Sequence, residues 1–278
     1  MLKSRFISVL FYFKGEKLMK FANLVIDRVD QGIFEKADGT IVGALNQVQN
    51  LTINTTTDPK DAVDARGVLI KRFYTAKNVE LSAENAILNL DLAGLQFGQP
   101  KVEASSENKI VLPRIMQVKT TSNSITLPEK PLDGTLTVYK CNDLGLPETK
   151  YTQNTVAGAG EYAISSSNVI TLPTDSVVGE VVQVKYEYET EKGAKVVQTS
   201  DKFPDTCKLT LSVLVCDPCD AETLRHAYIV FPSFQLSPDM DLSVATDAVH
   251  GFSGSAQVDF CSVDKNLYYI AISDDDVA

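Results

Sequence analysis

Residues 207–215 read Cys-Lys-Leu-Thr-Leu-Ser-Val-Leu-Val, and this stretch decides the fold class. Its odd-numbered positions are all apolar, whereas Lys208, Thr210 and Ser212 are polar. Apolar residues at every second position are typical of a β-strand with one buried face. A helix would instead repeat its apolar positions every three to four residues. The pattern therefore predicts a mainly β protein.

The same alternation extends outward from this stretch in both directions. It recurs at residues 229–231 and 267–271, and from Phe21 onward in short runs separated by turn residues. One short helix interrupts it. We predict that Ser82 caps this helix and that Gly94 suits its left-handed end. An apolar stripe near helical spacing supports it: Ile87, Leu88, Leu90, Leu92 and Leu95.

A repeated segment marks the middle of the chain. Residues 123–128 read Asn-Ser-Ile-Thr-Leu-Pro, residues 168–173 read Asn-Val-Ile-Thr-Leu-Pro, and Gly134 and Gly179 follow at the same offset. Each copy predicts a strand that ends at a proline, then a turn and a second strand. We interpret residues 113–199 as an inserted β-sandwich of immunoglobulin-like character. Residues 19–112 and 200–278 then form one discontinuous β domain, because the later strands most economically complete the first sheet.

Residues 1–18 differ in character from the rest of the chain. Lys3 and Arg5 precede an apolar run, as in a signal peptide, but the charged segment Lys14 to Lys17 comes next in place of small cleavage residues. The run is also too short to span a bilayer. Translation of a ribosome-binding site just upstream of Met19 would produce Gly-Glu, which is present here. We therefore expect residues 1–18 to be a non-native or disordered extension.

Charge and composition exclude several classes of function. The chain holds 26 Lys and Arg against 36 Asp and Glu, a formal net charge of −10, so phosphate is repelled and sequence-specific nucleic-acid binding is not expected. Only two histidines are present, His226 and His250, and there is no tryptophan. Phosphate-binding loops, dinucleotide-binding motifs and metalloprotease motifs do not occur. We expect neither an enzyme nor a bound cofactor.

Cys216-Asp-Pro-Cys219 is the one motif with chemical content. With Cys207 and Cys261 it could supply a zinc site or a disulfide, but the second C-x-x-C that would strengthen a zinc assignment is missing. A redox role would need a βαβ setting, which this strand-rich region does not offer. We favour a structural interpretation, in which Cys207 is a core residue and Cys216 and Cys219 flank a proline turn.

The order of elements allows a comparison with known folds. A strand, a Thr-rich loop and another strand lead into residues 76–94, which read Ala-Lys-Asn-Val-Glu-Leu-Ser-Ala-Glu-Asn-Ala-Ile-Leu-Asn-Leu-Asp-Leu-Ala-Gly, and further strands come after them. This order resembles the tail-tube (major tail) proteins of tailed bacteriophages over most of residues 21–272. The inserted block resembles the immunoglobulin-like modules of phage virion proteins, through its twin Ile-Thr-Leu-Pro segments and the strand at Tyr186–Thr190.

The resemblance implies a β-sandwich or half-barrel subunit with one short helix. Such subunits form hexameric rings that stack into a tube, through which DNA passes. It also implies a virion-tail location after synthesis in the bacterial host cytoplasm, no membrane contact, and tape-measure, sheath or terminator proteins as partners. A negatively charged lumen would let DNA slide, because cationic walls bind phosphate. The alternative function is a capsid decoration or surface-binding protein that uses the inserted sandwich.

Residues 55–66 are the candidate assembly segment. Pro59 cannot donate to a β ladder, and threonine and aspartate favour local turns, so we predict a long loop here. Long loops in compact domains are usually functional or disordered. Since the resemblance implies stacked rings, this loop is our candidate for reaching a neighbouring ring. Its candidate residues are Thr55, Thr56, Asp58, Lys60, Asp61 and Arg66.

Overall fold

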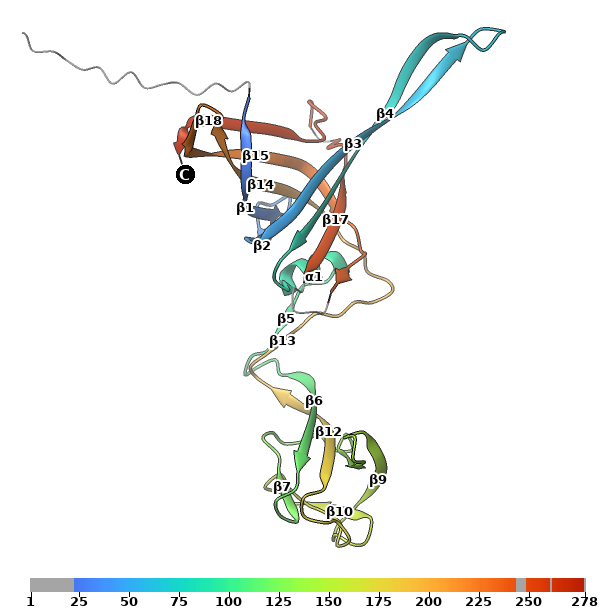
Figure 1. Ribbon diagram of the computed structural model, residues 1–278, viewed down its shortest axis with the longest axis vertical. Coiled ribbons are helices and arrows are strands. Elements are labelled where there is room, and N and C mark those ends of the chain that lie inside the picture. Colours follow the sequence, from blue (N-terminus) through green and yellow to red (C-terminus); the bar gives the residue numbers. More distant parts are fainter. Residues whose placement is uncertain (1–22, 244–248, 261, 278) are drawn as a thin grey trace, which may run out of the picture. The chain divides into compact units, whose positions relative to one another are not determined.

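The computed structural model describes residues 23–243, 249–260 and 262–277. It is mainly β, as predicted, with eighteen strands and one helix among the described residues. The chain divides into two compact units, described separately below: unit 1 is formed by the residues up to Pro100 and from Val196 onward, and unit 2 is Lys101–Lys195 (Figure 1). The boundary expected at residue 113 therefore lies inside a strand, β6 (Ile110–Lys119). The extension expected at residues 1–18 lies outside the described residues.

Unit 1 is built on a nine-stranded sheet that curls into a half-barrel. Strands β2-β1-β14-β15-β17-β4-β3 are neighbours in that order, with β16 beside β17 and β18 beside β15. Strand β15 divides the sheet, because Arg225–Val230 pairs with β18 and Phe234–Leu236 pairs with β17. The strands are β1 (Val25–Glu35), β2 (Ile41–Leu45), β3 (Val48–Val63), β4 (Leu69–Asn85), β14 (Thr206–Asp217), β15 (Asp220–Leu236), β16 (Asp241–Leu242), β17 (His250–Ala256) and β18 (Tyr269–Val277).

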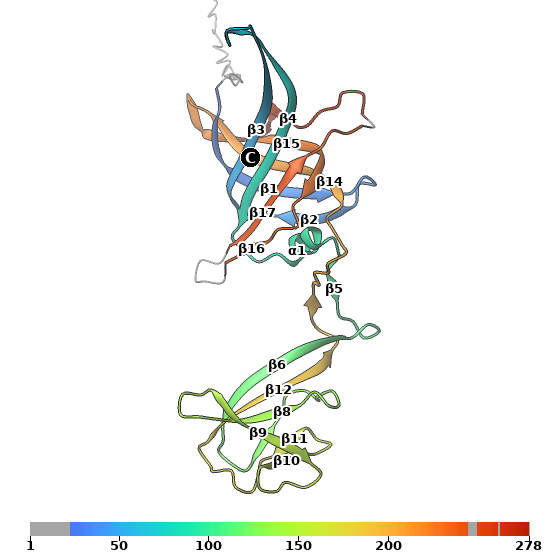
Figure 2. The same cartoon turned by 90° about the vertical axis from the view of Figure 1, so that its right-hand side faces the viewer.

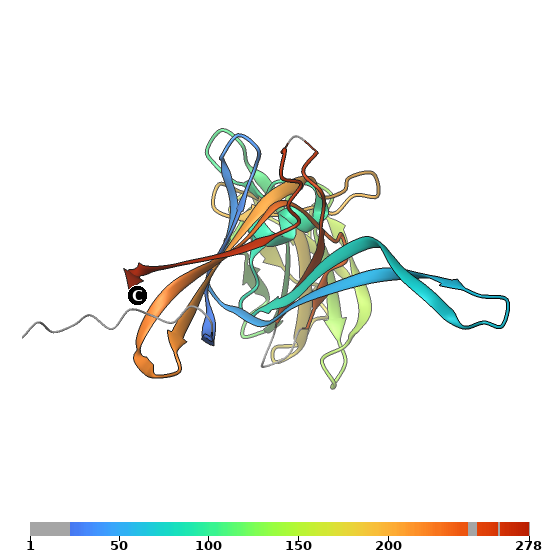
Figure 3. The ribbon, with the colours of Figure 1, turned by 90° about the horizontal axis from the view of Figure 1, so that it is seen from above.

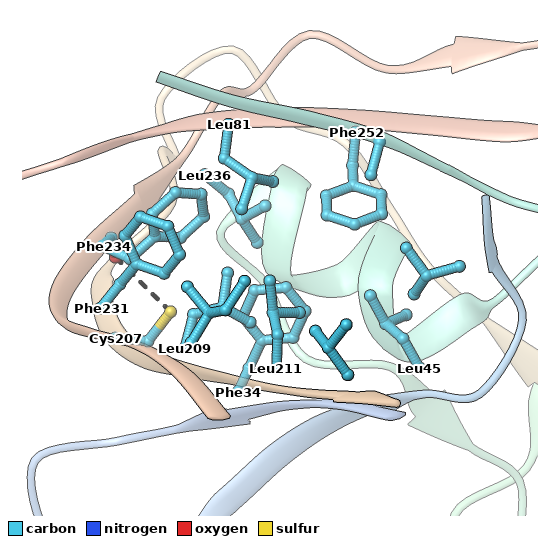
Figure 4. Close-up of a cluster of buried hydrophobic side chains, with 14 of the residues drawn as sticks. Phe34, Leu45, Leu81, Cys207, Leu209, Leu211, Phe231, Phe234, Leu236 and Phe252 are labelled. Carbon is cyan, nitrogen blue, oxygen red and sulfur yellow. Dashed lines mark hydrogen bonds between the residues drawn. The ribbon is translucent and has the colours of Figure 1, made fainter. Parts of the chain in front are cut away.

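The core of unit 1 lies inside the curled sheet (Figure 4). The odd-numbered residues of β14 point into it, and Leu209 and Leu211 are fully buried. Phe34 of β1 and Phe231 of β15 flank them, and the Phe252 ring meets Phe34 edge-on, with centroids 6.4 Å apart. Each such side chain contributes about 1.5–3 kcal/mol by leaving water. The alternation in residues 207–215 therefore does specify the buried face.

The single helix, α1 (Leu90–Phe97), lies later in the sequence than predicted. Ser82 does not cap it, because this residue lies within β4, where it pairs with Thr52 of β3 and with Ser253 of β17. The cap is Asn89, whose side chain accepts hydrogen bonds from the backbone N–H groups of Asp91 at 2.9 Å and Leu92 at 3.1 Å. The left-handed residue at the other end is Gly98, not Gly94. Strand pairing on both sides of residues 79–85 outweighs the helical spacing that begins just after them.

A buried histidine fixes the start of this helix. His250 is completely buried, and its Nε2 lies 2.7 Å from Gln96 Oε1. The amide of Gln96 donates to the backbone oxygens of Asp239 and Gly251, so its own oxygen must accept from the histidine. The imidazole therefore carries its proton on Nε2, and Nδ1 accepts the backbone N–H of Asn89. Burial lowers the pKa of His250 below its ordinary value of 6.5.

This setting predicts that the subunit loses stability on mild acidification. Because the folded pKa of His250 lies below that of the unfolded chain, the unfolded state takes up the proton first, so the free energy of unfolding falls as pH drops below 6.5. Urea unfolding at a series of pH values between about 7.5 and 5 measures the slope. The variant His226→Gln is the control and should keep it. An unfolding free energy that is constant across this window would contradict the prediction.

Unit 2 has its own sheet and core (Figure 2). The seven-stranded sheet has the order β6-β12-β8-β9-β10-β11-β7. A separate two-stranded sheet, β13-β5, pairs the chain segments that enter and leave the unit. The immunoglobulin-like assignment of this unit stays a prediction. The strands after β6 are β7 (Ser124–Thr126), β8 (Thr137–Cys141), β9 (Pro147–Asn154), β10 (Glu161–Ile164), β11 (Val169–Thr171) and β12 (Val181–Thr190), and the two-stranded sheet is β5 (Val102–Glu103) and β13 (Ala194–Lys195).

The twin segments of unit 2 pair with each other. Strands β7 and β11 are antiparallel neighbours, with Ile125 opposite Ile170. The Leu127 N–H donates to Asn168 O at 2.9 Å, and the Leu172 N–H donates to Asn123 O at 3.0 Å. The two bonds are equivalent, because Leu127 and Asn123 of the first copy correspond to Leu172 and Asn168 of the second. The sequence repeat is thus a local two-fold arrangement.

Candidate functional site

Residues 55–66 do not form the predicted loop. Most of them belong to β3, which pairs with β4 in a long hairpin. We call residues 56–78 the arm; they extend the hairpin beyond the last pair between β4 and β17, Glu80 with Ser255. Figures 1 and 3 show the arm extending away from the rest of unit 1. Pro59 is accommodated because β3 is an edge strand and its register shifts between Thr57 and Pro59.

The candidate assembly residues are distributed along this hairpin. Thr55, Thr56 and Lys60 sit opposite Val79, Asn78 and Phe73. The backbone oxygen of Asp58 accepts the Thr75 hydroxyl at 3.1 Å. Arg66 lies in the turn, where its N–H donates to Asp64 Oδ1 at 2.8 Å.

One ion pair ties the two strands of the arm together. Arg72 donates from Nε and Nη2 to the two carboxylate oxygens of Asp61, at 2.7 and 2.9 Å. The guanidinium beside it lowers the pKa of Asp61. Two parallel bonds between these planar groups fix their relative orientation. The arm is therefore an ordered hairpin, although no third strand flanks it among the described residues.

The arm exposes large apolar side chains on both of its faces. Tyr74 is 67% exposed and Phe73 is 47% exposed, and these adjacent strand residues point to opposite faces. The other exposed apolar residues of the arm are Val63, Val68, Leu69 and Ile70. An exposed apolar surface of this kind marks a candidate interaction site. Sequence reasoning selected the polar residues of this segment and missed the apolar ones.

A second feature is the four-stranded ribbon β1-β14-β15-β18, whose two margins have unpaired strand edges within the described structure. On its outer side, β1 is covered by β2 only from Gly32 to Glu35, so residues 25–31 have a free edge within the described structure. At the other margin β18 pairs with β15 alone. The two free edges lie level, because Gln31 lies opposite Ser212, Ser212 opposite Tyr228, and Tyr228 opposite Ala271. Both edges carry exposed apolar residues, including Ile26 and Ile270.

The ribbon face opposite the core carries polar side chains. The even-numbered residues of β14 point this way: Lys208, Thr210 and Ser212 are polar, as the alternation predicted, whereas Leu214 and Cys216 further along the strand are apolar and buried. His226 of β15 stacks on Tyr228 with an interplanar angle of 19°, and Ser212 Oγ lies 2.9 Å from His226 Nδ1. At one end of this face Lys208 pairs with Glu35 at 2.7 Å. These side chains present hydrogen-bonding and aromatic groups.

The cysteines do not come together as a site. Cys207 is buried in β14, and burial raises the pKa of its thiol to about 11. Cys216 is buried and Cys219 is exposed in the turn before β15, and all three thiols are free, which corrects the disulfide alternative for them. Cys261 lies outside the described residues. Among the side chains that the structure describes, no cluster of three or more His, Cys, Asp or Glu could hold a metal ion.

These features define a β-rich structural subunit. It has a half-barrel sheet, a ribbon with unpaired edges and a projecting hairpin. The comparison with known families makes the assignment specific: residues 24–266 match the YomU/Tube protein family, and the chain belongs to it. It is a phage tail-tube protein, a structural component of the virion tail. No curated protein matches the chain. Within the described residues, no helix is long and apolar enough to cross a membrane.

Proposed function

We propose that this protein assembles into hexameric rings, and that the rings stack into a tail tube through which DNA passes. The observation that carries the proposal is the ribbon β1-β14-β15-β18, which ends in two level free edges. Unpaired edges attract another strand. A second copy of the same chain is the partner that a virion tube protein encounters in quantity.

The strand directions suit a head-to-tail ring. Each neighbouring pair in the ribbon is antiparallel, so β1 and β18 also run in opposite directions. Placing β18 of one copy beside the free part of β1 of the next copy continues the alternation. A head-to-tail interface closes into a ring when its rotation allows. Six copies is the number that the family resemblance implies.

A closed ring of six would leave a wide channel. Four strands from each copy would make a barrel of about 24 strands, which at about 4.8 Å spacing and about 40° tilt is roughly 48 Å across between backbones. Smaller barrels of about 16 to 18 strands already hold an aqueous channel. The channel would be lined by the ribbon face opposite the core, because the core side is filled by Leu209, Leu211 and Phe231. Tape-measure, sheath and terminator proteins would bind the finished tube.

The arm supplies the contact between rings in this proposal. Its apolar residues contact no third strand among the described residues, and both of its faces need a partner. Burial of such side chains between stacked rings would favour growth of the tube by the hydrophobic effect. The candidate residues Thr55, Thr56, Asp58, Lys60, Asp61 and Arg66 would then lie at or near this contact.

Electron microscopy of the purified protein tests the proposal. We expect rings at low concentration and tubes of uniform width at high concentration. The matched variant lacks unit 2: since Lys195 pairs with Val102, the ends of this unit lie about 5 Å apart and a short Gly-Ser linker can join Pro100 to Val196. It should still form tubes, because the ribbon and the arm belong to unit 1. Monodisperse monomers at high concentration, for the full chain, would overturn the proposal.

A further inference from the structure

A groove runs along β3, β4 and β17 on the face that lies opposite the core of unit 1, and we call it the outer groove. It encloses about 720 Å³. The side chains on its floor alternate along β4 with core residues such as Leu81. Phe203, which is 65% exposed, also lines the groove. The floor consists of two rows of paired residues, Thr52, Ser82 and Ser253 in one row and Asn54, Glu80 and Ser255 in the other.

The outer groove is acidic. Glu80 lies on its floor, and an adjoining hollow is lined by Glu84, Asp239 and Asp241. Ser82 lines both hollows, so they are continuous. Among the described residues that line them, none is a lysine or an arginine. The four carboxylates form no ion pair in the part of the chain that the structure describes, so this surface attracts a cationic partner.

One face of the arm carries the opposite charge. Lys60 and Phe73 lie directly opposite each other in the hairpin, and Lys71 is two residues from Phe73 along β4, so the three side chains share a face. The Lys71 ammonium lies 5.0 Å from the centre of the Phe73 ring, which agrees with this placement. Arg72 and its carboxylate partner point to the other face. Neither lysine forms an ion pair with another described residue. We call these three side chains the Phe73 face.

The arm differs in charge from the rest of the chain and cannot reach its own groove. Residues 56–78 hold five Lys and Arg against three Asp, whereas the whole chain has a formal net charge of −10. Lys71 and Glu80 are nine residues apart on β4, which is about 30 Å along an extended strand. The arm also extends away from the rest of unit 1 (Figure 1). A contact between the Phe73 face and the outer groove therefore needs two copies of the chain.

We propose that the Phe73 face of the arm binds in the outer groove of a second copy of this chain in the adjacent ring. This inference rests on the proposed function, in which the arm contacts the next ring. Lys60 and Lys71 pair with carboxylates of the groove, and the Phe73 ring packs against the exposed ring of Phe203. Each copy carries one arm and one groove at different positions. The contact is therefore head-to-tail and can be repeated from ring to ring.

Cross-linking of assembled tubes of the unmodified protein tests the contact. A zero-length carbodiimide reagent joins an amine to a carboxylate only where the two groups touch. We expect links from Lys60 or Lys71 to carboxylates of the outer groove, identified by mass spectrometry after proteolysis. Such links join two copies, because within one copy these groups are more than about 20 Å apart along the strands. Tubes without links between the arm lysines and the groove would overturn the inference, while the proposed function stands.

Charge reversal and its rescue provide a second test. The arm variant Lys60→Glu with Lys71→Glu should raise the critical concentration for tube formation roughly tenfold, since attraction becomes repulsion. The groove variant Glu80→Lys with Asp241→Lys should have the same effect. All four changes in one chain should return the critical concentration to within about threefold of the original, because every copy supplies both an arm and a groove.

A matched control separates this contact from a general effect of net charge. Lys150 and Lys185 are exposed lysines of unit 2, and replacing both with Glu changes the net charge as much as the arm variant does. This control should form tubes at the unmodified concentration. A chain with all four changes that assembles no better than the arm variant would overturn the inference. Absence of tubes from the unmodified protein would instead overturn the proposed function, and this inference with it.

Discussion

Placing charges on both faces of the arm should prevent tube formation at the concentration at which the unmodified protein assembles, while the subunit stays folded. In the double variant Phe73→Glu and Tyr74→Glu, each face of the hairpin loses an aromatic side chain. Neither ring belongs to the core of unit 1. Loss of their burial between rings should cost about 3 kcal/mol per subunit, which raises the critical concentration for assembly roughly a hundredfold. Sedimentation and electron microscopy across a concentration series measure this.

A matched control separates the arm from exposed apolar residues in general. Leu144 is 83% exposed and lies in unit 2, so Leu144→Glu adds a charge at an apolar position that is even more accessible than the two in the arm. This variant should assemble at the concentration of the unmodified protein. Circular dichroism should show the same strand content in all three proteins. If the arm variant forms tubes at the unmodified concentration, the arm is not the contact between rings.

Gly98→Ala should destabilise unit 1 by about 3–5 kcal/mol, a large part of the stability of an ordinary domain. Gly98 ends helix α1 with φ of +67°, where its N–H bonds to the carbonyls of Gly94 and Leu95. A methyl group here would lie within 3.0 Å of the backbone N, C and O of Phe203, in the segment that leads into β14. Backbone atoms cannot move aside as a flexible side chain would. Thermal unfolding monitored by circular dichroism measures the loss.

Gly39→Ala is the control for backbone conformation alone. Gly39 lies in the turn between β1 and β2 with φ of +84°, and a methyl group there would meet nothing within 4 Å. The Gly39→Ala substitution should lower the free energy of unfolding by only about 1 kcal/mol, the ordinary penalty of a left-handed residue. Equal losses of unfolding free energy in the two variants would show that the close approach of Phe203 to the helix end does not add to the cost of Gly98→Ala.

Local alternation was sufficient to predict the fold class and the buried face of β14. Every second residue from Cys207 to Val215 enters the core, because successive side chains of a strand point to opposite sides. The twin Ile-Thr-Leu-Pro segments likewise predicted two equivalent strands. The predicted start of the helix was too early, because Ser82 and Asn89 are both acceptable caps by residue type. Only the pairing of Ser82 with β3 and β17 excludes the first of them.

The arm shows where sequence reasoning could not succeed. Pro59 and the neighbouring threonines and aspartate suit a loop as well as an edge strand, and no local signal distinguishes the two. The distinction depends on β4, which provides the partner for every position from Val63 back to Thr55 except Asp58. The apolar residues from Leu69 to Tyr74 could have indicated that the segment is a strand with an uncovered surface. Their exposure is visible only once the end of the hairpin is known to have no neighbour within the described structure.

The amino-acid sequence by itself determined the mainly β class, the repeat within unit 2 and the alternation that separates the core of β14 from its polar face. These properties depend on residues within a few positions of one another, so period and composition express them directly. Within the described residues, tertiary structure alone decided that the two margins of the ribbon are level and free, that the arm has two uncovered faces, and that His250 is buried with both ring nitrogens hydrogen-bonded. Each of these depends on pairing between strands such as β1, β14 and β18, which lie far apart along the chain. No local pattern encodes which distant strand will be the neighbour.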